Sequence, residues 1–503
     1  MTAVARAGAS RVAKTPIAMC LRRVPTVAWM CALIAFLNAT AWALIVPPFQ
    51  GKDETDHFAY VVQLAEDGSL PEGEGYTGRW PLSEWVVLRA LHYNEVRHSP
   101  AIGTISTIQE QAKLDEALHA GAPTRGLGQA GIASTEPPLY YAVQAIPYYL
   151  GSGNVLTQLQ LMRLLGSVFG ALTALLAFLF LRETLPGTPL AATVGGLCVA
   201  LQPLLAFMSG SVNPDSMLYT VAAAVFLCLA RAFRRGLTFR LAIVLGLLIA
   251  AGFLTKLNFI GFAAGVYLGL LLLAVRGARS LGRRALASPA LAACIGALPA
   301  IVYTLSNVLS GRAPFGLASG FGGKLSSESQ SLSHELSYIW QLYLPRLPGM
   351  THYFAGMTTF KDVWLDRSVG LYGWFDTMFA PWVNDVALIP AAIVVVLCGR
   401  ELAARRGALR GHLSELATYA AITVGVLAMV GASSYIGDVI DHEAPFGEPR
   451  YLLPMLPLFG AVMALAVRAG GRRWAPVVGA ALVMLILGHD VFSQLQVIAR
   501  YYG

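Results

Sequence analysis

Apolar stretches of about 20 residues recur along the chain, and short charged segments separate them. A helix of that length crosses the hydrocarbon core of a bilayer, which is about 30 Å thick. The pattern therefore predicts an all-α polytopic membrane protein. We expect about eleven transmembrane helices, over residues 24–46, 161–181, 190–209, 214–231, 240–255, 257–275, 286–307, 381–398, 414–434, 451–467 and 474–490.

Two long segments, 47–160 and 308–380, interrupt the predicted helices inside what we expect to be one transmembrane domain over 1–503. The apolar segment 137–150 is short, opens with two prolines and contains Pro147, so we expect an interfacial helix there rather than a further span. With eleven spans and a cytoplasmic N-terminus, both long segments and the C-terminus lie outside the cytoplasm.

The first long segment carries helical signals of its own. Apolar positions on one face predict a helix over 54–66, and residues 83–93 are amphipathic. Ser106 and Gln109 have the spacing of a capping box, which opens a helix ending near Gly121. We expect these helices to lie in the membrane interface and to cover the spans.

Composition and charge support the membrane assignment. Hydrophobic residues make up 56% of the chain and charged residues 13%, against about a quarter charged in soluble domains. The net charge of +8 is spread over short connections rather than one patch, which argues against a nucleic-acid partner. Arginines in short loops mark the cytoplasmic side. They are Arg231, Arg234, Arg235, Arg276, Arg279, Arg283, Arg284, Arg405, Arg406, Arg410, Arg472 and Arg473.

The N-terminal region allows two interpretations. Residues 1–23 are basic and precede an apolar run that reaches about Val46, while residues 39–41 resemble a signal-peptide cleavage site. The run is long for a signal peptide, so we expect an uncleaved first span, with cleavage as the alternative. The six cysteines fall in predicted spans or cytoplasmic segments, so we expect no disulfide in the external segments.

The segment after the first span concentrates reactive groups. Asp53, Glu54, Asp56 and His57 place three carboxylates and an imidazole within five residues. Asp53 and His57 are spaced i, i+4 and can share a helix face. A carboxylate there can act as a general base, and Asp53, Asp56 and His57 together are also able to ligate a divalent metal ion. The alternative is that Asp53 or Thr55 caps the following helix, and capping is compatible with catalysis.

Two further segments bring polar groups to the same predicted side. Glu136 is followed by Tyr140 and Tyr141, for which the alternative is the start of an interfacial helix within an aromatic belt. Asn213 and Asp215 lie at the external ends of the third and fourth spans, where an N-cap of the fourth span is the alternative role.

Three more positions are candidates for substrate contacts. Lys256 lies at the tight turn between the fifth and sixth spans, where a lysine can also simply extend to the membrane surface. Trp374 and Asp376 lie on a glycine-rich turn and are able to stack on, and hydrogen-bond, a sugar ring.

Arg450 lies where the tenth span begins on the external side. A guanidinium group at that depth is costly without an anionic partner. A lipid phosphate would supply a bidentate partner, and an ion pair with Glu443 or Glu448 is the alternative.

The order of these motifs resembles one family. PPFQ with DE-x-x-HF, then EPPLYY, GS-x-NPD, LTK, GW with FD, and PRYLLP follow one another over nearly the whole chain. They are similar to the bacterial membrane protein family of domain of unknown function 2142 (DUF2142). That family is itself similar to the GT-C glycosyltransferases, which include protein O-mannosyltransferases and lipid A aminoarabinose transferases.

The resemblance implies a polyprenyl-phosphate sugar donor and transfer on the extracytoplasmic face of a bacterial plasma membrane. In such enzymes the first-loop acidic motif holds the base, here Asp53 with Glu54 beside it. Relatives often have His or Lys before the Pro-Pro-Leu, where this chain has Glu136, which shifts the expected phosphate contact to Arg450 or Lys256.

The resulting hypothesis is a membrane glycosyltransferase that serves a glycan, lipid or protein acceptor among membrane lipids. No cofactor is firmly expected, because a monophosphate donor does not require a metal. The predicted site residues are Asp53, Glu54 and His57 for catalysis, Arg450, Lys256 and Tyr140 for the donor phosphate, and Glu136, Asn213, Asp215, Trp374 and Asp376 for substrate.

A transporter or flippase of a lipid-linked glycan is the alternative function. Transporters tend to keep ionisable residues at mid-membrane and often show inverted repeats. In this sequence the acids gather at one side of the predicted spans and no inverted repeat is apparent, which favours an enzyme.

Overall fold

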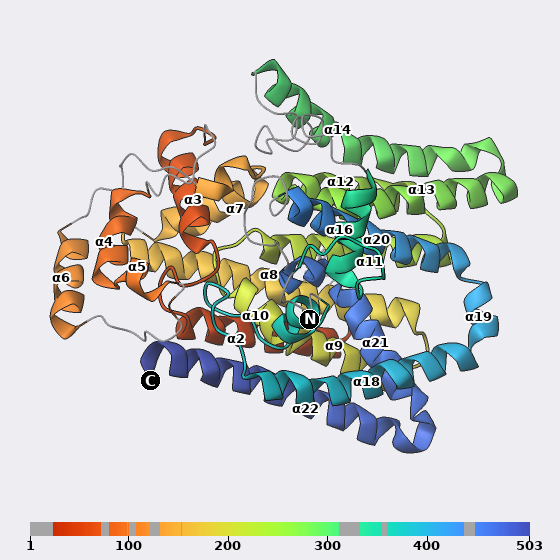
Figure 1. Cartoon of the computed structure of the whole chain (residues 1–503). Helices are drawn as coiled ribbons and strands as arrows, with labels where there is room; N and C mark the ends of the chain where they lie inside the picture. Colours follow the sequence, from red (N-terminus) through yellow and green to blue (C-terminus); the bar gives the residue numbers. More distant parts are fainter. Residues whose placement is uncertain are drawn as a thin grey trace, which may run out of the picture.

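A computed structural model describes residues 24–71, 80–97, 99, 107–120, 131–151, 153–310, 332–354, 360–436 and 448–503. Within these ranges the regular structure is helical, apart from one isolated bridge between Tyr372 and Thr377. The long helices lie side by side, α3 to α7 gather at one end of the bundle, and α19 lies at the opposite end (Figure 1).

Nine helices in the described part of the chain are long and apolar enough to cross a membrane. They are α2 (Thr26–Ile45), α8 (Val155–Thr184), α11 (Asp215–Arg235), α13 (Phe259–Leu281), η2 (Arg283–Leu286) with α14 (Ala287–Leu309), α18 (Pro381–Ala404), α20 (Leu413–Tyr435), η5 (Pro449–Met455) with α21 (Leu456–Ala469), and α22 (Gly471–Tyr502).

Two more elements complete the predicted set. The helices α9 (Pro189–Ala200) and α10 (Pro203–Ser209) pass the same test as a pair and give a tenth span. The helix α12 (Phe239–Thr255) is apolar but shorter, at 17 residues. Every predicted span thus has a helical counterpart, and a multi-pass helical membrane protein is confirmed.

The span predicted over 190–209 is bent rather than straight. Its axis turns by 50° between α9 and α10. Proline at the first position of α10 lacks the N–H that would continue the α9 ladder, and the side chain of Gln202 accepts a hydrogen bond from Leu205 N–H to start the new helix. The bend brings Gly210 against α2, where a Cβ would lie 2.6 Å from the carbonyl oxygen of Ala39.

Short helices form the end of the bundle that carries the first long segment. They are α3 (Glu54–Asp67), α4 (Leu82–Ala90), α5 (Tyr93–Val96), α6 (Ile108–His119), η1 (Gly131–Thr135) and α7 (Leu139–Leu150). The helix predicted over 54–66 is confirmed, with Gly68 at its C-cap in the left-handed region. The segment 137–150 forms α7, which is too short to count among the candidate spans.

The capping box of α6 lies one residue later than predicted. Thr107 accepts a hydrogen bond from Glu110 N–H, and the Glu110 carboxylate accepts from Thr107 N–H at 2.7 Å. The prediction placed the box at Ser106 and Gln109 and was wrong, because threonine followed by glutamate satisfies both backbone donors with a charged acceptor.

The remaining elements are α16 (Leu332–Tyr343), the π-helical turn η3 (Phe360–Asp366), α17 (Arg367–Val369) and α19 (Arg406–Arg410). The helix α22 extends well past the predicted span of 474–490, to Tyr502. Its Arg500 donates from Nη2 to the backbone oxygens of Val96 and Ser99, at 2.9 Å each. The last turns of α22 therefore support the first long segment.

Close helix packing in the bundle depends on small residues. The helices α13 and α20 approach most tightly at Gly261 and Gly425, where a Cβ on Gly261 would lie 2.5 Å from the carbonyl oxygen of Gly425. Small residues at crossings allow backbones in a membrane to gain dispersion contacts that larger side chains would prevent. These contacts hold the ends of α11, α13 and α20 together, and those ends position the site.

Candidate active site

Asp53 occupies an unusual backbone position between α2 and α3. Its φ of 59° lies in the left-handed region, which costs a non-glycine residue on the order of 1–2 kcal/mol. Asp53 is the N-cap residue of α3, yet its side chain makes no capping hydrogen bond. The carboxylate is therefore turned away from the helix end, and the capping alternative does not account for it.

The carboxylate of Asp53 is buried and pairs with Arg450, 397 positions later in the chain. Arg450 Nη2 lies 2.9 Å from Asp53 Oδ2, and Lys52 Nζ lies 3.2 Å from Oδ1. Burial by itself raises the pKa of Asp53, but the charges of Arg450 and Lys52 outweigh burial and hold the pKa well below its usual range. Asp53 is therefore ionised at neutral pH.

Arg450 lies at the centre of several acidic groups. Its Nε is 2.7 Å from Glu448 Oε2 and 3.8 Å from Asp215 Oδ2, but neither contact is aligned as a hydrogen bond. Its Nη2 also donates to Tyr451 Oη at 3.0 Å. Arg450 Nη1 is buried and has no hydrogen-bond partner in the described chain. The ion pair with Glu448 that the sequence allowed is present, and Glu443 lies outside the described residues.

Asp215 and Lys256 form a second ion pair beside the first. Lys256 Nζ donates to Asp215 Oδ1 at 2.7 Å, and both side chains are buried. Asp215 Oδ2 is buried without a hydrogen-bond partner in the described residues. Asn213 links this pair to the acidic loop, because its Nδ2 donates to Lys52 O at 3.1 Å while its Oδ1 accepts from Asp215 N–H.

Glu136 reaches the same cluster from the segment before α7. Its Oε2 accepts a hydrogen bond from Leu257 N–H at 3.2 Å, which places the carboxyl beside the Lys256 turn. Burial raises the pKa of Glu136, and the nearby charge of Lys256 opposes that rise. The backbone oxygen of Glu136 accepts from Tyr60 Oη at 3.2 Å, so α3 positions the segment.

His57 and the tyrosines of α7 form one wall of the cluster. His57 Nδ1 and Tyr141 Oη are 2.9 Å apart, and Tyr60 stacks on Tyr141 with 3.6 Å between ring centroids. Burial lowers the pKa of His57 to about 3, so the imidazole is neutral at physiological pH. Tyr140 is fully buried and accepts from Gln144 Nε2 at 2.9 Å.

The metal site that the sequence allowed does not form in the described chain, where no three His, Cys, Asp or Glu side chains are placed to hold an ion. Asp56 instead accepts a hydrogen bond from Trp80 Nε1 at 2.8 Å. Burial raises the pKa of Asp56 to about 6 despite this hydrogen bond, and the nearby charge of Asp53 adds to the rise.

Glu54 lies in a separate and closed ion pair. Arg163 in α8 donates to both of its oxygens, from Nε at 2.8 Å and from Nη2 at 2.5 Å, and both side chains are buried. Val212 N–H donates to Glu54 Oε1 at 2.9 Å. The remaining donors of Arg163 reach the carbonyl oxygens of Ala43, Val46 and Pro47. Every donor of the guanidinium group is thus used.

Trp374 and Asp376 lie near the cluster but face other partners. The ring of Trp374 is only 4% exposed, is covered by the Arg97 guanidinium group at 4.0 Å, and donates its indole N–H to Phe49 O. Asp376 Oδ2 lies 3.6 Å from Arg500 Nη2. These contacts occupy both groups that were expected to bind a sugar.

Phe375, between them, reaches Arg450, whereas within the cluster Trp374 contacts Lys52, whose Nζ lies 5.2 Å from its ring centroid. The φ of Phe375, 62°, lies in the left-handed region, so its side chain points in a different direction from those of the neighbouring residues. The ring centroid lies 5.2 Å from the Arg450 guanidinium carbon and 5.6 Å from Lys52 Nζ. An aromatic face attracts cations without using their hydrogen-bond donors. The glycine-rich turn therefore contributes Phe375 to the site.

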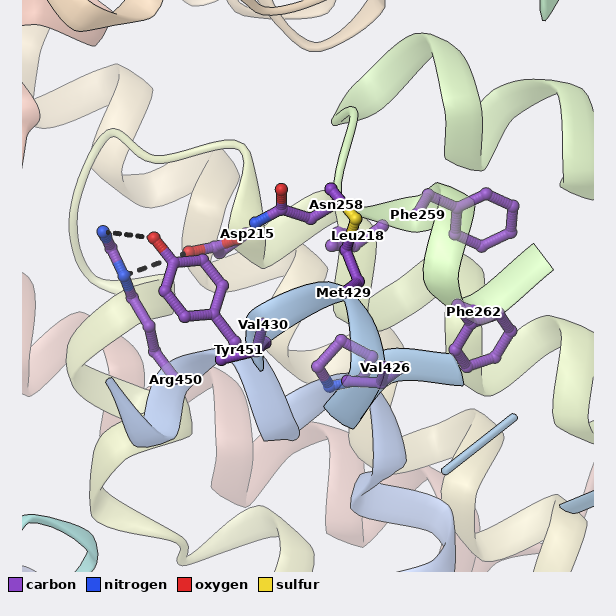
Figure 2. A pocket seen from close by; sticks show the side chains of 11 residues that line it. Asp215, Leu218, Asn258, Phe259, Phe262, Val426, Met429, Val430, Arg450 and Tyr451 are labelled. Carbon is purple, nitrogen blue, oxygen red and sulfur yellow. Dashed lines mark hydrogen bonds and ion pairs between the residues drawn. The ribbon is translucent and has the colours of Figure 1, made fainter. Parts of the chain in front are cut away.

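A narrow groove, with a cavity volume of about 20 Å³, adjoins the cluster between α11, α13, α20 and η5. Asp215, Asn258, Arg450 and Tyr451 form its polar end, and Figure 2 shows Phe262 and Val426 at its other end. Its apolar lining consists of Leu218, Phe259, Phe262, Val426, Met429, Val430 and Pro454. The groove joins a cationic group to an apolar surface, which is the arrangement that suits an amphiphile with an anionic head.

Sequence reasoning missed Lys52, Phe375 and Tyr451 as members of this cluster, and Arg163 as the partner of Glu54. Arg163 had a usable signal, because an arginine among apolar residues of a predicted span requires an anionic partner. Lys52 and Tyr451 adjoin residues that were singled out, Asp53 and Arg450. No sequence pattern pointed to Phe375, because the direction of its side chain depends on a left-handed backbone conformation.

The fold and the cluster define a multi-pass helical membrane protein with a buried acid–base site at one end of its bundle. The chain belongs to the family described as "Predicted membrane protein (DUF2142)", whose model matches residues 36–459. No curated protein matches the sequence.

Solved structures of two kinds are similar in shape. ArnT from Cupriavidus metallidurans, bound to undecaprenyl phosphate, is 14% identical with a TM-score of 0.46, over 93% of this chain and 73% of that chain. The oligosaccharyltransferase AglB from Archaeoglobus fulgidus, in complex with an inhibitory peptide and a dolichol-phosphate, is 12% identical with a TM-score of 0.48. That match covers 95% of this chain and 56% of AglB.

Proposed function

We propose that this protein is a membrane glycosyltransferase that moves a sugar from a polyprenyl-phosphate donor to a glycan, lipid or protein acceptor. One observation carries the proposal. The buried Arg450 has an unpartnered Nη1 at the polar end of an apolar groove, while its Nη2 lies 2.9 Å from Oδ2 of the ionised Asp53. A phosphate bound by Arg450 would place the sugar next to a base.

The groove supplies the binding part of the proposal. A polyprenyl chain lies along the apolar side chains of α13 and α20, and its phosphate meets Arg450 with Lys256 behind. A charge-assisted hydrogen bond from a buried guanidinium group is stronger than a neutral one, and two parallel bonds fix the geometry. Burial of the phosphate would also satisfy a donor that otherwise costs about 1–3 kcal/mol.

Asp53 supplies the base. Its carboxylate removes the proton of an acceptor hydroxyl, the oxygen attacks the anomeric carbon, and the bond from that carbon to the phosphate oxygen breaks. The polyprenyl phosphate leaves with the bonding electron pair, and Arg450 and Lys256 balance its charge. In the unliganded state Arg450 holds Asp53 strongly acidic, and a phosphate that draws Arg450 away makes Asp53 more basic.

Neighbouring residues position these groups. Asn213 ties the acidic loop to the Asp215–Lys256 pair, and Glu136 binds the turn that carries Lys256. Neutral His57 and Tyr140 form the wall behind Asp53. We assign Glu54 a positioning role, because its pair with Arg163 fixes the start of α3 one residue from Asp53.

The transporter alternative receives less support from this geometry. Carriers tend to place ionisable groups at mid-membrane, where a site can open to either side. Here the acid–base cluster lies at one end of the bundle, at the starts of α11 and α13. Its base is already ionised beside a cationic group, which is what transfer of a glycosyl group requires.

Orientation can be tested by labelling. The basic short connections at the other end of α11 and α13 predict that the cluster faces the extracytoplasmic side. In a cysteine-free background, Ser69→Cys in the exposed turn after α3 should react with an impermeant thiol reagent in intact cells, and Gly407→Cys in α19 should not. Reaction of Gly407→Cys alone would reverse the orientation.

The activity is tested by complementing a deletion strain and profiling its cell-envelope glycans. Wild-type protein should restore a glycan that the deletion strain lacks, and Asp53→Asn should not. Asp115→Asn, on the exposed face of α6, is the matched control and should restore it. An Asp53→Asn variant that restores the glycan fully would remove Asp53 as the base and favour the carrier function.

A further inference from the structure

A second pocket lies at the opposite ends of the helices that form the active-site groove. The helix α11 begins at Asp215 in the groove and ends at Arg235 in this pocket. Its 21 residues span about 30 Å, which is the thickness of a bilayer core. The two sites therefore face opposite surfaces of the membrane.

The lining of the second pocket is mainly cationic. It is built by the ends of α8, α11 and α13 and by the connection between α19 and α20. Its charged and aromatic lining residues are Glu183, Phe233, Arg234, Arg235, Arg276 and His412. Three guanidinium groups, one imidazole and one carboxylate thus line the pocket, and Glu415 beside it pairs with Arg234 and His412.

Existing ion pairs hold two of the arginines in place without neutralising the pocket. Arg235 is bidentate to Glu183, at 2.8 Å and 2.5 Å. Arg234 donates only through Nε, to Glu415 Oε1 at 3.2 Å, so both of its Nη groups have no partner in the described residues. A guanidinium group fixed by its Nε presents two parallel donors, which is the geometry that binds a phosphate.

An exposed apolar surface begins directly beside these charges. On α13, Leu271 and Val275 are 58% and 41% exposed and precede Arg276. On α20, Leu413 and Leu416 are 61% and 40% exposed and follow His412. In a membrane these side chains contact acyl chains, since the two helices are candidate spans that pack on each other.

We propose that this pocket binds the phosphate headgroup of an anionic phospholipid from the leaflet opposite the active site. Arg234 supplies parallel donors to the phosphate, and Arg235 and Arg276 add positive charge around it. The acyl chains lie along the apolar faces of α13 and α20. A basic pocket between transmembrane helices next to exposed apolar side chains is complementary to both halves of such a lipid. The site is independent of the proposed transfer reaction.

The test compares two charge-matched double variants of the full-length protein. Arg235→Gln/Arg276→Gln removes two exposed guanidinium groups from the pocket, whereas Arg234–Glu415 and Arg231 beside Glu183 remain. Arg240→Gln/Arg473→Gln removes two exposed arginines from the first turns of α12 and α22, at the same end of the bundle and outside the pocket. Purified proteins in phosphatidylcholine micelles are titrated with phosphatidylglycerol, and retained lipid is measured by native mass spectrometry.

Wild-type protein and the Arg240/Arg473 variant should each retain one phosphatidylglycerol, with phosphatidylcholine excluded. The Arg235/Arg276 variant should bind phosphatidylglycerol on the order of tenfold more weakly, since each basic group near the headgroup contributes to binding. Equal losses in both double variants would show diffuse surface charge and overturn the proposal.

Two further experiments test the proposal even if the Arg235/Arg276 variant does not fold. Inorganic phosphate added to wild-type protein should fail to displace the lipid, and full displacement would show a site for a soluble phosphate. Arg235→Lys/Arg276→Lys keeps the charge and should retain most of the binding. Equal retention of phosphatidylcholine by wild-type protein would also overturn the proposal.

Discussion

Adjacent residues, Asp53 and Glu54, enter two buried ion-pair networks that differ in one respect. Around Glu54, Arg163 uses every N–H donor, on two carboxylate oxygens and three carbonyl groups. Around Asp53, Arg450 Nη1 and Asp215 Oδ2 are buried without hydrogen-bond partners in the described chain. The first network is closed, and the second has capacity for a ligand.

The difference separates structural from functional use of the same chemistry. A buried charge is tolerated when hydrogen bonds satisfy it, so the closed network needs nothing further and holds α3 against α8. An open network bears the cost of unpaired groups until a ligand satisfies them. Burial and pairing are common to both carboxylates, so the unsatisfied donor beside Asp53 is the feature that distinguishes them.

The largest effect is expected for Asp53→Asn, which removes the carboxylate of the open network. The amide keeps the size of the side chain but no longer accepts a proton, so transfer should fall on the order of 10²–10⁴-fold. The fold should persist, since Asp53 makes no capping bond and Arg450 keeps Glu448 as an anionic partner. Glycan restoration in the deletion strain measures the activity, and thermal unfolding of the purified variant measures the fold. Activity within about threefold of wild type would place the base elsewhere.

The closed network should respond in the opposite way. Arg163→Met leaves the buried Glu54 charge and three carbonyl groups without their partner, which should lower stability by about 3–5 kcal/mol. Unfolding in detergent measures the loss. The double variant Glu54→Gln/Arg163→Met removes the unpaired charge and should regain part of the stability. No recovery in the double variant would contradict an ion-pair origin of the effect.

Arg450→Lys probes whether the open network binds a phosphate. Lysine keeps the charge near Asp53 but not the parallel donors, so affinity for undecaprenyl phosphate should fall on the order of tenfold. Thermal stability should change little, because an ammonium group still pairs with Asp53 and Glu448. Binding is measured on purified protein with undecaprenyl phosphate as the probe. Unchanged affinity would exclude Arg450 and direct attention to Lys256.

Hydropathy accounts for how much of this architecture could be predicted from the sequence. A span leaves a long apolar run, so the helices from Thr26–Ile45 to Gly471–Tyr502 were expected near their observed positions. The polar end of the bundle was also expected, because charged loops report the side on which they lie. The 50° bend at α9 and α10 was not, although Gln202 and Pro203 carried the signal.

The ion pairs within the site could not be predicted from the sequence. Asp53 and Arg450 were both singled out, yet no periodicity relates residues 397 positions apart, and only the tertiary fold brings them together. The directions of the side chains on the glycine-rich turn could not be predicted either. The left-handed φ of Phe375 turns that ring to Arg450 and leaves Trp374 under Arg97, whereas composition favoured Trp374.

Phe375→Leu is expected to have the smallest effect, and it tests whether an aromatic contact helps to hold Arg450 in the open network. The ring of Phe375 lies 5.2 Å from the Arg450 guanidinium carbon and 5.6 Å from Lys52 Nζ, and attracts both cations through its face. Leucine keeps much of the apolar volume but loses this attraction, which is worth about 0.5–2 kcal/mol. Because Arg450 would then be held less firmly, undecaprenyl phosphate should bind about threefold to tenfold more weakly while stability changes little.

The matched control is Trp374→Phe at the neighbouring position, which keeps an aromatic ring under Arg97 but removes the indole N–H bond to Phe49. That bond lies outside the open network, so the control should lower stability slightly and leave lipid affinity unchanged. If Trp374→Phe weakened lipid binding and Phe375→Leu did not, the sugar contact first expected of Trp374 would be favoured. The role assigned to Phe375 would then be excluded, because its ring would contribute nothing to holding Arg450. Among the described residues, Arg450 is the groove's one cation with an unpartnered donor.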